Sequence, residues 1–354
     1  MKTILNSLFV IFLISCAQKP TTEFEIYGRY DQVVGNLAVS SENRVFVSIH
    51  PFASPKYKVT EEVDGKLKPY PSAKVSASFA NVIGLRVSQA GDLWILDMGG
   101  RLYGHNIKTN KKIKEISLKK QMTKTSFFQD FALDQKNNFA YIAEMSRGNL
   151  LGESRPGIIS VNLKTGATKK FLSGHPSVDS DGSKMKIGDQ VVTAKSGSGQ
   201  FVPLRLGLNP ITISSNFEFV YYGSMHGRKL YRIATQTLRD FSLTETEVEN
   251  QVQVVGLKAV SDGISVDSKN NVYVTDVNSY GIGVTKPNGT YELLFSNPEK
   301  IIWPDGFSCG GDGMMYFTIN QLHLNAALNR GQQLAKAPFT IGRFKPLAPC
   351  EVGR

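Results

Sequence analysis

The chain has 354 residues, of which 41% are hydrophobic, 10% aromatic and 20% charged, and its formal net charge is +11. Frequent aromatic residues and aperiodic glycines exclude a disordered or collagen-like chain. The positive balance favours anionic partners. Its densest part, between Lys108 and Lys124, lacks the arginines and interleaved aromatic residues typical of nucleic-acid sites, so we expect a solvated face and no nucleic-acid partner there.

The N-terminal residues are typical of a secretory signal. A lysine precedes an apolar run over residues 8–14, which is too short to span a bilayer. Residues 13–16, Leu-Ile-Ser-Cys, resemble the bacterial lipobox, whose cysteine is lipidated. We therefore expect a signal peptide over 1–15 and a lipidated Cys16 with its linker over 16–25. This implies a cell-envelope lipoprotein, on the outer membrane or the periplasmic face. A plain signal peptide and a secreted protein are the alternative.

One short pattern recurs six times along the chain. Each copy has three residues of apolar-x-apolar type, then four or five polar, glycine or asparagine residues, then an apolar-aromatic run. Alternation around such turn residues is typical of a β-hairpin. The copies begin at Leu37, Leu85, Phe131, Ile211, Ile264 and Phe307.

The spacing of the copies predicts the architecture. Four of the five intervals lie between 43 and 53 residues, close to the length of a propeller blade. We therefore predict an all-β fold, a six-bladed β-propeller with four-stranded antiparallel blades around a central channel, as one domain over residues 26–350. Residues 25–30 are expected to close the ring beside 340–344. The one long interval contains an irregular insertion around 174–207, which we expect to be functional.

Polar residues precede the first strand of several hairpins in equivalent positions. Because the first strands of a propeller line the channel, these residues should converge on one mouth. Asn209, Asp262 and Asp305 lie two residues before their hairpins, and Asn36 and Asp130 lie one residue before theirs.

Converging carboxylates repel each other unless a cation compensates them. Oxygen atoms of aspartate and asparagine suit Ca²⁺, so Asn209, Asp262 and Asp305 are candidate metal ligands. Asp262 and Asp305 are also candidate catalytic residues that transfer a proton. The alternative is that these Asp-Gly pairs are turn residues whose carboxylates bind local backbone N–H groups.

Aromatic and amide side chains are expected around this acidic mouth, and they suit a cationic or polyhydroxylated small molecule. For the aromatic residues the alternative is packing within the blades. The candidate ligand contacts are Asn36, Asp130, Tyr222, His226, Trp303, Thr318, Asn320 and His323.

Other chemistries find little support. The five histidines lack metal-binding spacing, and nucleophile-elbow, P-loop and Cys-x-x-Cys motifs are absent from the sequence. Cys309 and Cys350 could pair in an oxidising compartment, and the sequence leaves this open.

Several phrases resemble the major royal jelly protein/yellow family, among them residues 91–99 (GDLWILDMG), 303–306 (WPDG) and 320–323 (NQLH). The resemblance runs from about residue 30 to 345, and the lipobox points to a bacterial branch. It implies a secreted six-bladed propeller. Some members of that family are linked to dopachrome conversion and others bind biogenic amines in the channel, so membership does not fix an activity.

The channel register is more distantly similar to gluconolactonase/senescence-marker propellers, whose metal is held by Glu, Asn and Asp. Asn209 and Asp262 match two of those ligands, but Gly35-Asn36 stands where those enzymes have the glutamate. Three hypotheses remain. The first is a monomeric ligand-binding propeller that takes an amine, a catechol or a similar molecule and acts as a dopachrome-tautomerase-like isomerase if it is an enzyme. The second is a calcium-dependent lactonase, and the third a non-catalytic scaffold.

Overall fold

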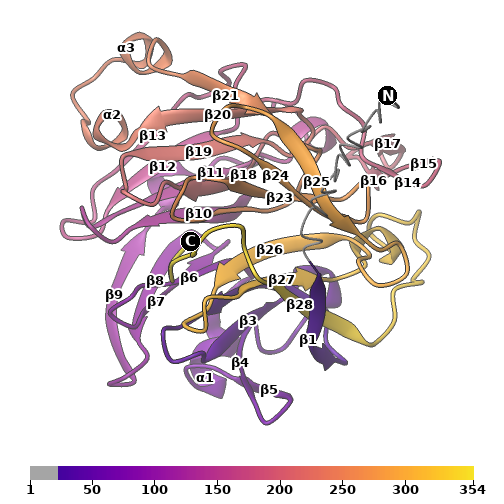
Figure 1. Cartoon of the computed structure of the whole chain (residues 1–354). Coiled ribbons are helices and arrows are strands. Elements are labelled where there is room, and N and C mark those ends of the chain that lie inside the picture. Colours follow the sequence, from indigo (N-terminus) through magenta and orange to yellow (C-terminus); the bar gives the residue numbers. More distant parts are fainter. Residues whose placement is uncertain (1–22) are drawn as a thin grey trace, which may run out of the picture.

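All six predicted hairpins form, and each is the inner half of a four-stranded antiparallel sheet (Figure 1). The computed structural model describes residues 23–354, so the expected signal peptide and the lipidation at Cys16 lie outside the described residues. The six sheets confirm the prediction of a six-bladed propeller. The first five blades are β2 (Val34–Val39) to β5 (Lys66–Pro69) with β3 (Val45–Ile49) and β4 (Val59–Val63); β6 (Val82–Val87), β7 (Asp92–Asp97), β8 (Arg101–Asn106) and β9 (Lys111–Ser117); β10 (Phe128–Asp134), β11 (Phe139–Glu144), β12 (Gly157–Asn162) and β13 (Thr168–Phe171); β18 (Leu208–Ile213), β19 (Phe219–Ser224), β20 (Lys229–Ala234) and β21 (Gln253–Leu257); and β22 (Ile264–Val266), β23 (Val272–Asp276), β24 (Gly281–Thr285) and β25 (Tyr291–Ser296).

The sixth blade joins the two ends of the described chain. It consists of β26 (Pro304–Cys309), β27 (Met315–Ile319), β28 (Phe339–Phe344) and, at its outer edge, β1 (Phe24–Tyr30). Strand β1 pairs antiparallel with β28, which confirms the expected closure. It begins two residues before the expected domain start, because the Phe24 ring stacks on Phe295 with centroids 5.3 Å apart.

The first strands of the blades form the inner ring. Strands β2, β6, β10, β18, β22 and β26 each contact the next around the axis. Every residue of these strands is buried, because each inner strand packs against neighbouring blades on both of its faces. The polar side chains in this ring therefore need partners inside the protein.

The insertion covers the end of the channel from which the inner strands start. It forms two small hairpins, β14 (Lys186–Ile187) with β15 (Gln190–Val191), and β16 (Thr193–Lys195) with β17 (Phe201–Pro203). Their flanking residues Met185, Val192 and Leu206 belong to one apolar cluster with Trp303 and Leu322. This burial fixes the insertion over the mouth.

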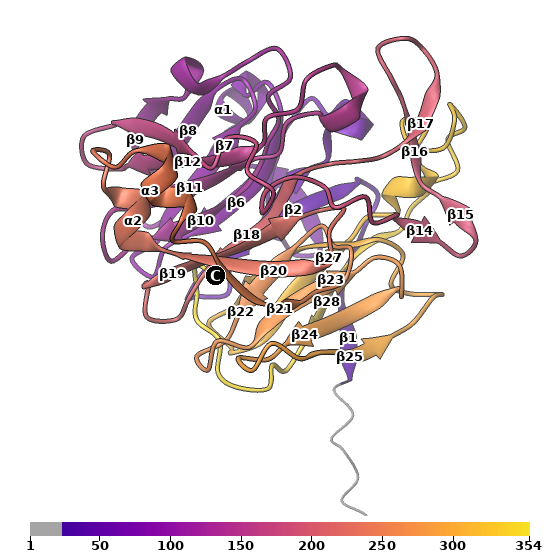
Figure 2. The ribbon, with the colours of Figure 1, turned by 90° about the horizontal axis from the view of Figure 1, so that it is seen from above.

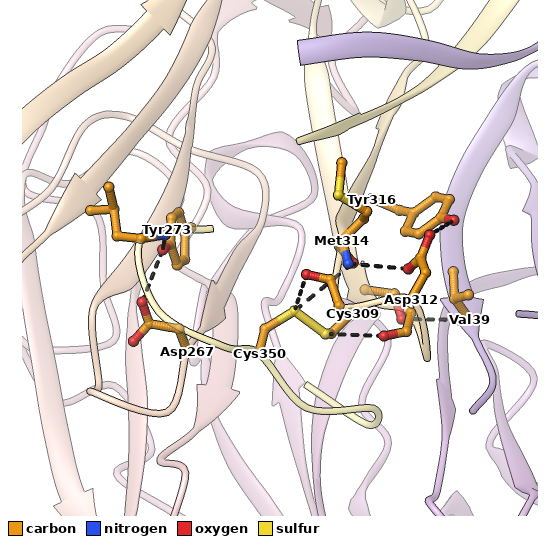
Figure 3. The surroundings of a disulfide bond; sticks show 12 residues. Val39, Asp267, Tyr273, Cys309, Asp312, Met314, Tyr316 and Cys350 are labelled. Carbon is orange, nitrogen blue, oxygen red and sulfur yellow. Dashed lines mark hydrogen bonds between the residues drawn. A yellow bond between two sulfur atoms is a disulfide. The ribbon is translucent and has the colours of Figure 1, made fainter. Parts of the chain in front are cut away.

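Residues 345–354 cover the opposite end, where the hairpin turns lie. Cys350 forms a disulfide with Cys309, so the pairing that the sequence left open is made (Figure 3). The Ser268 N–H donates to the Pro349 carbonyl at 2.8 Å. The buried Arg354 guanidinium donates to the Ser215 carbonyl. In both overall views the insertion and this segment lie on opposite sides of the molecule (Figures 1 and 2).

The remaining regular elements are short and lie in connections. They are α1 (Ala73–Ser78), α2 (Thr235–Arg239), α3 (Glu245–Glu249) and the 3₁₀ turns η1 (Pro51–Ala53), η2 (Lys119–Gln121), η3 (Gly148–Leu150) and η4 (Leu322–Leu324). Among residues 23–354 there is no helix with the length and apolar character needed to cross a membrane.

Candidate functional site

A β-bulge interrupts the inner strand near its start in five of the six blades. A bulge leaves a residue out of the ladder and redirects its side chain, here toward the channel mouth. In the sixth blade the ladder starts only at Ile264, directly after Asp262 and Gly263. The register shifts lie between Val34 and Leu37, Val82 and Leu85, Phe128 and Asp130, Leu208 and Ile211, and Pro304 and Phe307.

Hydroxyl groups of the second strands hold three of these strand starts. Ser48 Oγ accepts from the Asn36 N–H at 2.9 Å and donates to the Ile83 carbonyl of the next blade. Thr318 Oγ1 accepts from the Gly306 N–H and donates to the Gly35 carbonyl at 2.6 Å. Thr318, expected as a ligand contact, is therefore occupied in joining blades. The sequence analysis missed Ser48.

Thr275 performs the same task beneath Asp262. Its Oγ1 accepts from the N–H groups of Asp262 and Gly263 at 3.1 and 2.9 Å. This residue was also missed. Its signal was present in the repeat itself, because Thr275 and Thr318 both lie 11 or 12 residues after the bulge glycine or the residue next to it.

Asp262 is buried and receives three side-chain donors. Asn209 Nδ2 lies 2.8 Å from its Oδ1, Gln129 Nε2 lies 3.5 Å from the same oxygen, and Trp303 Nε1 lies 2.8 Å from Oδ2. Burial raises the pKa of Asp262 to about 6, against the effect of the Trp303 and Asn209 hydrogen bonds. Asn209 and Asp262, expected from their register to meet, are in direct contact.

Asp305 lies on the adjoining inner strand. The two strands approach so closely at this point that a Cβ on Gly263 would lie 2.2 Å from the Asp305 carbonyl oxygen. Asp305 Oδ2 accepts from Asn320 Nδ2 at 2.7 Å. Burial, and then the charge of Asp262, raise the pKa of Asp305 well above its ordinary value. Within residues 23–354, neither Asp262 nor Asp305 forms an ion pair.

Asp130 differs from these two carboxylates because it has its own cation. Arg86 Nη2 lies 2.6 Å from Asp130 Oδ2, and both side chains are buried. The sequence analysis missed Arg86, although an arginine between the apolar residues of an inner strand was a usable signal. Asn36 Oδ1 accepts from the backbone N–H of Leu37. Three buried carboxylates therefore face one guanidinium at this mouth.

Amide oxygens add to this excess of acceptors. Gln129 Oε1, Asn209 Oδ1 and Asn320 Oδ1 are all buried and find no donor among the described residues. Each belongs to an amide whose nitrogen donates to Asp262 or Asp305. A buried acceptor without a donor costs about 1–3 kcal/mol, so this set is suited to a ligand that supplies N–H donors or positive charge.

The expected aromatic and histidine contacts divide into two groups. Trp303 lies directly over Asp262, and its ring is nearly parallel to that of His323. Tyr222 instead packs between two blades, with its hydroxyl on Ser177 Oγ at 2.9 Å. His226 Nδ1 accepts from the Leu206 N–H, which fastens the end of the insertion to the fourth blade.

Neither histidine carries a charge at neutral pH. Burial, and then Lys258, lower the pKa of His226 to about 4. Burial lowers the pKa of His323 to about 4 as well. The mouth therefore holds no imidazolium that would repel a cationic ligand.

The model of the major royal jelly protein family matches residues 80–333, more than half of the chain. The chain belongs to this family. No curated protein matches its sequence.

Solved propellers share the fold of this family member. A luciferin-regenerating enzyme is 11% identical with a TM-score of 0.58, over 94% of this chain and all of the other. A gluconolactonase from Xanthomonas campestris is 9% identical with a TM-score of 0.57, over 92% and 90%. Virginiamycin B lyase from Staphylococcus aureus is 16% identical with a TM-score of 0.51, over 92% and 100%. At these identities the likeness concerns the fold.

The donor set was tested against a calcium ion, the metal expected at the site from the sequence. Two carboxylates and the unpartnered amide oxygens of Gln129, Asn209 and Asn320 are the ligand chemistry that Ca²⁺ takes. The residues therefore fit a hard cation. Within residues 23–354, no three His, Cys, Asp or Glu side chains are grouped as metal ligands, so such a site depends on the amides.

Proposed function

We propose that the protein binds a small organic cation, such as an amine, at the covered mouth of its channel. The observation that carries the proposal is the pair Asp262 and Asp305, buried together without a protein cation among unpartnered amide oxygens. An ammonium group supplies both what the carboxylates lack and what the amide oxygens lack. Trp303 lies beside Asp262 and adds an aromatic face to the same site.

We also propose that the protein acts in the cell envelope, held there by a lipid on Cys16. The lipobox-like residues support this location. The Cys309–Cys350 disulfide supports it too, because disulfides form and persist mainly in oxidising compartments. Labelling with a radioactive fatty acid tests the anchor, since the label should be absent from a Cys16→Ala variant.

Amine binding is expected to depend on pH. The proton on Asp262 competes with the ammonium group, and the pKa of this carboxyl is raised to about 6. Affinity should therefore increase as the pH rises through 6, by up to about tenfold per unit for each proton displaced. Below pH 5 the carboxyl is protonated, and the ligand should bind weakly.

Thermal unfolding with ethylammonium chloride tests the proposal. At pH 7.5 the ammonium salt should raise Tm, whereas equal concentrations of potassium chloride or ethanol should not, because only the ammonium ion combines charge with N–H donors. The effect should be lost in Asp305→Asn and kept in Asp31→Asn, which changes an exposed aspartate. An equal Tm rise with potassium chloride, or an unchanged response in Asp305→Asn, contradicts the proposal.

Proton transfer on the bound ligand is the catalytic form of this proposal. A dopachrome-tautomerase-like isomerisation moves a proton within the substrate, and a carboxylate with a pKa near 6 suits that work. Asp262 is the residue we assign to it, with Asp305 next to it. Conversion of dopachrome by the purified protein, abolished in Asp262→Asn, tests this step. No conversion by the intact protein removes it and leaves the binding proposal standing.

A calcium-dependent lactonase is the second candidate. It is favoured by the contact of Asn209 with Asp262 and by the unpartnered Asn209 Oδ1. Asp262, Asp305 and Asn209 would hold the ion, which when bound would polarise a lactone carbonyl. A Tm rise with millimolar CaCl₂, reversed by chelator, together with hydrolysis of gluconolactone, favours this candidate over amine binding.

A further inference from the structure

A cavity of about 840 Å³ adjoins the channel mouth on the side of the insertion. The hairpins β14–β15 and β16–β17 form one wall, with Val192 and Phe201 among the residues that face the cavity. The segment after β27 forms the other wall and contributes Leu324, Leu328 and Leu334. Eight of its fourteen lining residues are apolar, and Arg330 is the one that carries a full charge.

Two stacked rings connect this cavity with the acidic mouth. His323 lines the cavity, and its ring lies 6.0 Å from that of Trp303, at an interplanar angle of 12°. On its other side Trp303 donates its indole N–H to Asp262. His323 Nδ1 is buried and has no partner among the described residues.

The backbone at these rings is unusual. Trp303 has a φ of 60° and Gln321, two residues before His323, a φ of 55°. Bulky residues rarely hold this left-handed conformation, which costs about 1–3 kcal/mol and is retained mainly at ligand sites and switches. The rings are thus held between the cavity and Asp262 at a cost that packing alone does not require.

We propose that the cavity receives the apolar body of the cation whose ammonium group binds Asp262 and Asp305. This inference rests on the proposed function and names its ligand class, an amphiphilic amine. Cavities of 300–1,000 Å³ commonly enclose a drug-sized ligand, so a body larger than one aromatic ring fits here. His323 and Trp303 lie where the body meets the charged head, and they must shift when the ligand enters.

Three probes of graded chemistry test the inference by calorimetry at pH 7.5: ethylammonium, octylammonium and 1-octanol. Each methylene that leaves water strengthens binding about fourfold, so octylammonium should bind at least tenfold more tightly than ethylammonium. Octanol has the same tail without the charge and should bind more weakly than octylammonium.

Matched variants locate the tail. Leu328→Trp fills the cavity and should remove the advantage of octylammonium while ethylammonium binds as before. Leu334→Gln is a milder change at a half-exposed lining residue and should reduce the advantage about threefold. Leu293→Gln changes a similarly exposed leucine on β25 and should leave it unchanged.

Fluorescence reports on the rings. The chain has two tryptophans, so Trp94→Phe leaves Trp303 as the single emitter. Octylammonium should shift its emission with the same Kd that calorimetry gives. If ethylammonium binds but the octyl tail adds no affinity, or if Leu328→Trp keeps the advantage, the inference is overturned and the proposed function stands. If no ammonium binds at all, the proposed function fails and the inference with it.

Discussion

Asp305 shows how position, rather than residue type, determines the chemistry of a side chain in this protein. It is buried beside Asp262, whose charge raises its pKa, while Asp130, only slightly further around the ring, has the guanidinium of Arg86. The repeat register was enough to bring Asn209 and Asp262 together, because equivalent positions of a propeller meet at one mouth. It was not enough to find Arg86 or to place Tyr222, since the facing of these side chains depends on packing between blades.

Replacing Asp305 by asparagine is predicted to stabilise the ligand-free protein at high pH. A carboxyl whose pKa is raised by folding contributes stability below its unfolded pKa near 4, and this contribution is lost as the pH rises. The variant should therefore unfold at about 1–3 kcal/mol higher free energy at pH 8, and no differently from the parent at pH 3.5. Urea unfolding at the two pH values measures this, and equal stability at pH 8 contradicts the assigned environment.

Two connecting elements cover the ends of the channel, and the sequence predicted them unequally. The insertion stood out because it broke the blade spacing, and it lies over the mouth through Met185, Val192 and Leu206. The function of residues 345–354 was not visible in the sequence. Their contacts with Tyr273 and Ser215 join segments more than 70 residues apart, and no local pattern indicates such a partner (Figure 3).

Removing the disulfide is predicted to destabilise the propeller. The bond closes a loop of 41 residues, for which the chain-entropy account gives about 4 kcal/mol. Cys350→Ala should lower the free energy of unfolding by roughly that amount, and dithiothreitol should do the same to the parent protein. The reductant should have no further effect on Cys350→Ala. A parent protein that is indifferent to the reductant would show that the bond does not form.

At the scale of the whole molecule, ring closure joins the first described strand to the last. Strand β1 covers the outer edge of β28, with Glu25 2.6 Å from Arg343 and the Phe24 ring on Phe295. The number of blades and this closure were predictable because both follow from a repeat with regular spacing. The enclosed cavity beside His323 was not, since it arises where the insertion meets the segment after β27.

A protein that lacks residues 1–30 should keep five blades but expose the edge of β28. Unpaired edge strands associate with other chains, so we expect aggregation and a Tm lower by about 10 °C or more. A protein that lacks only residues 1–22 keeps β1 and is the control. Light scattering during heating distinguishes the two, and equal behaviour would mean that β1 does not close the ring.

A crystal structure of the protein with octylammonium at pH 7.5 tests the central claim most directly. The account predicts the ammonium nitrogen within hydrogen-bond distance of Asp262 and Asp305, near the oxygens of Asn209 and Asn320. The alkyl chain should pass Trp303 into the cavity. An amine bound elsewhere, with Asp262 and Asp305 contacting only water or each other through a shared proton, would contradict it.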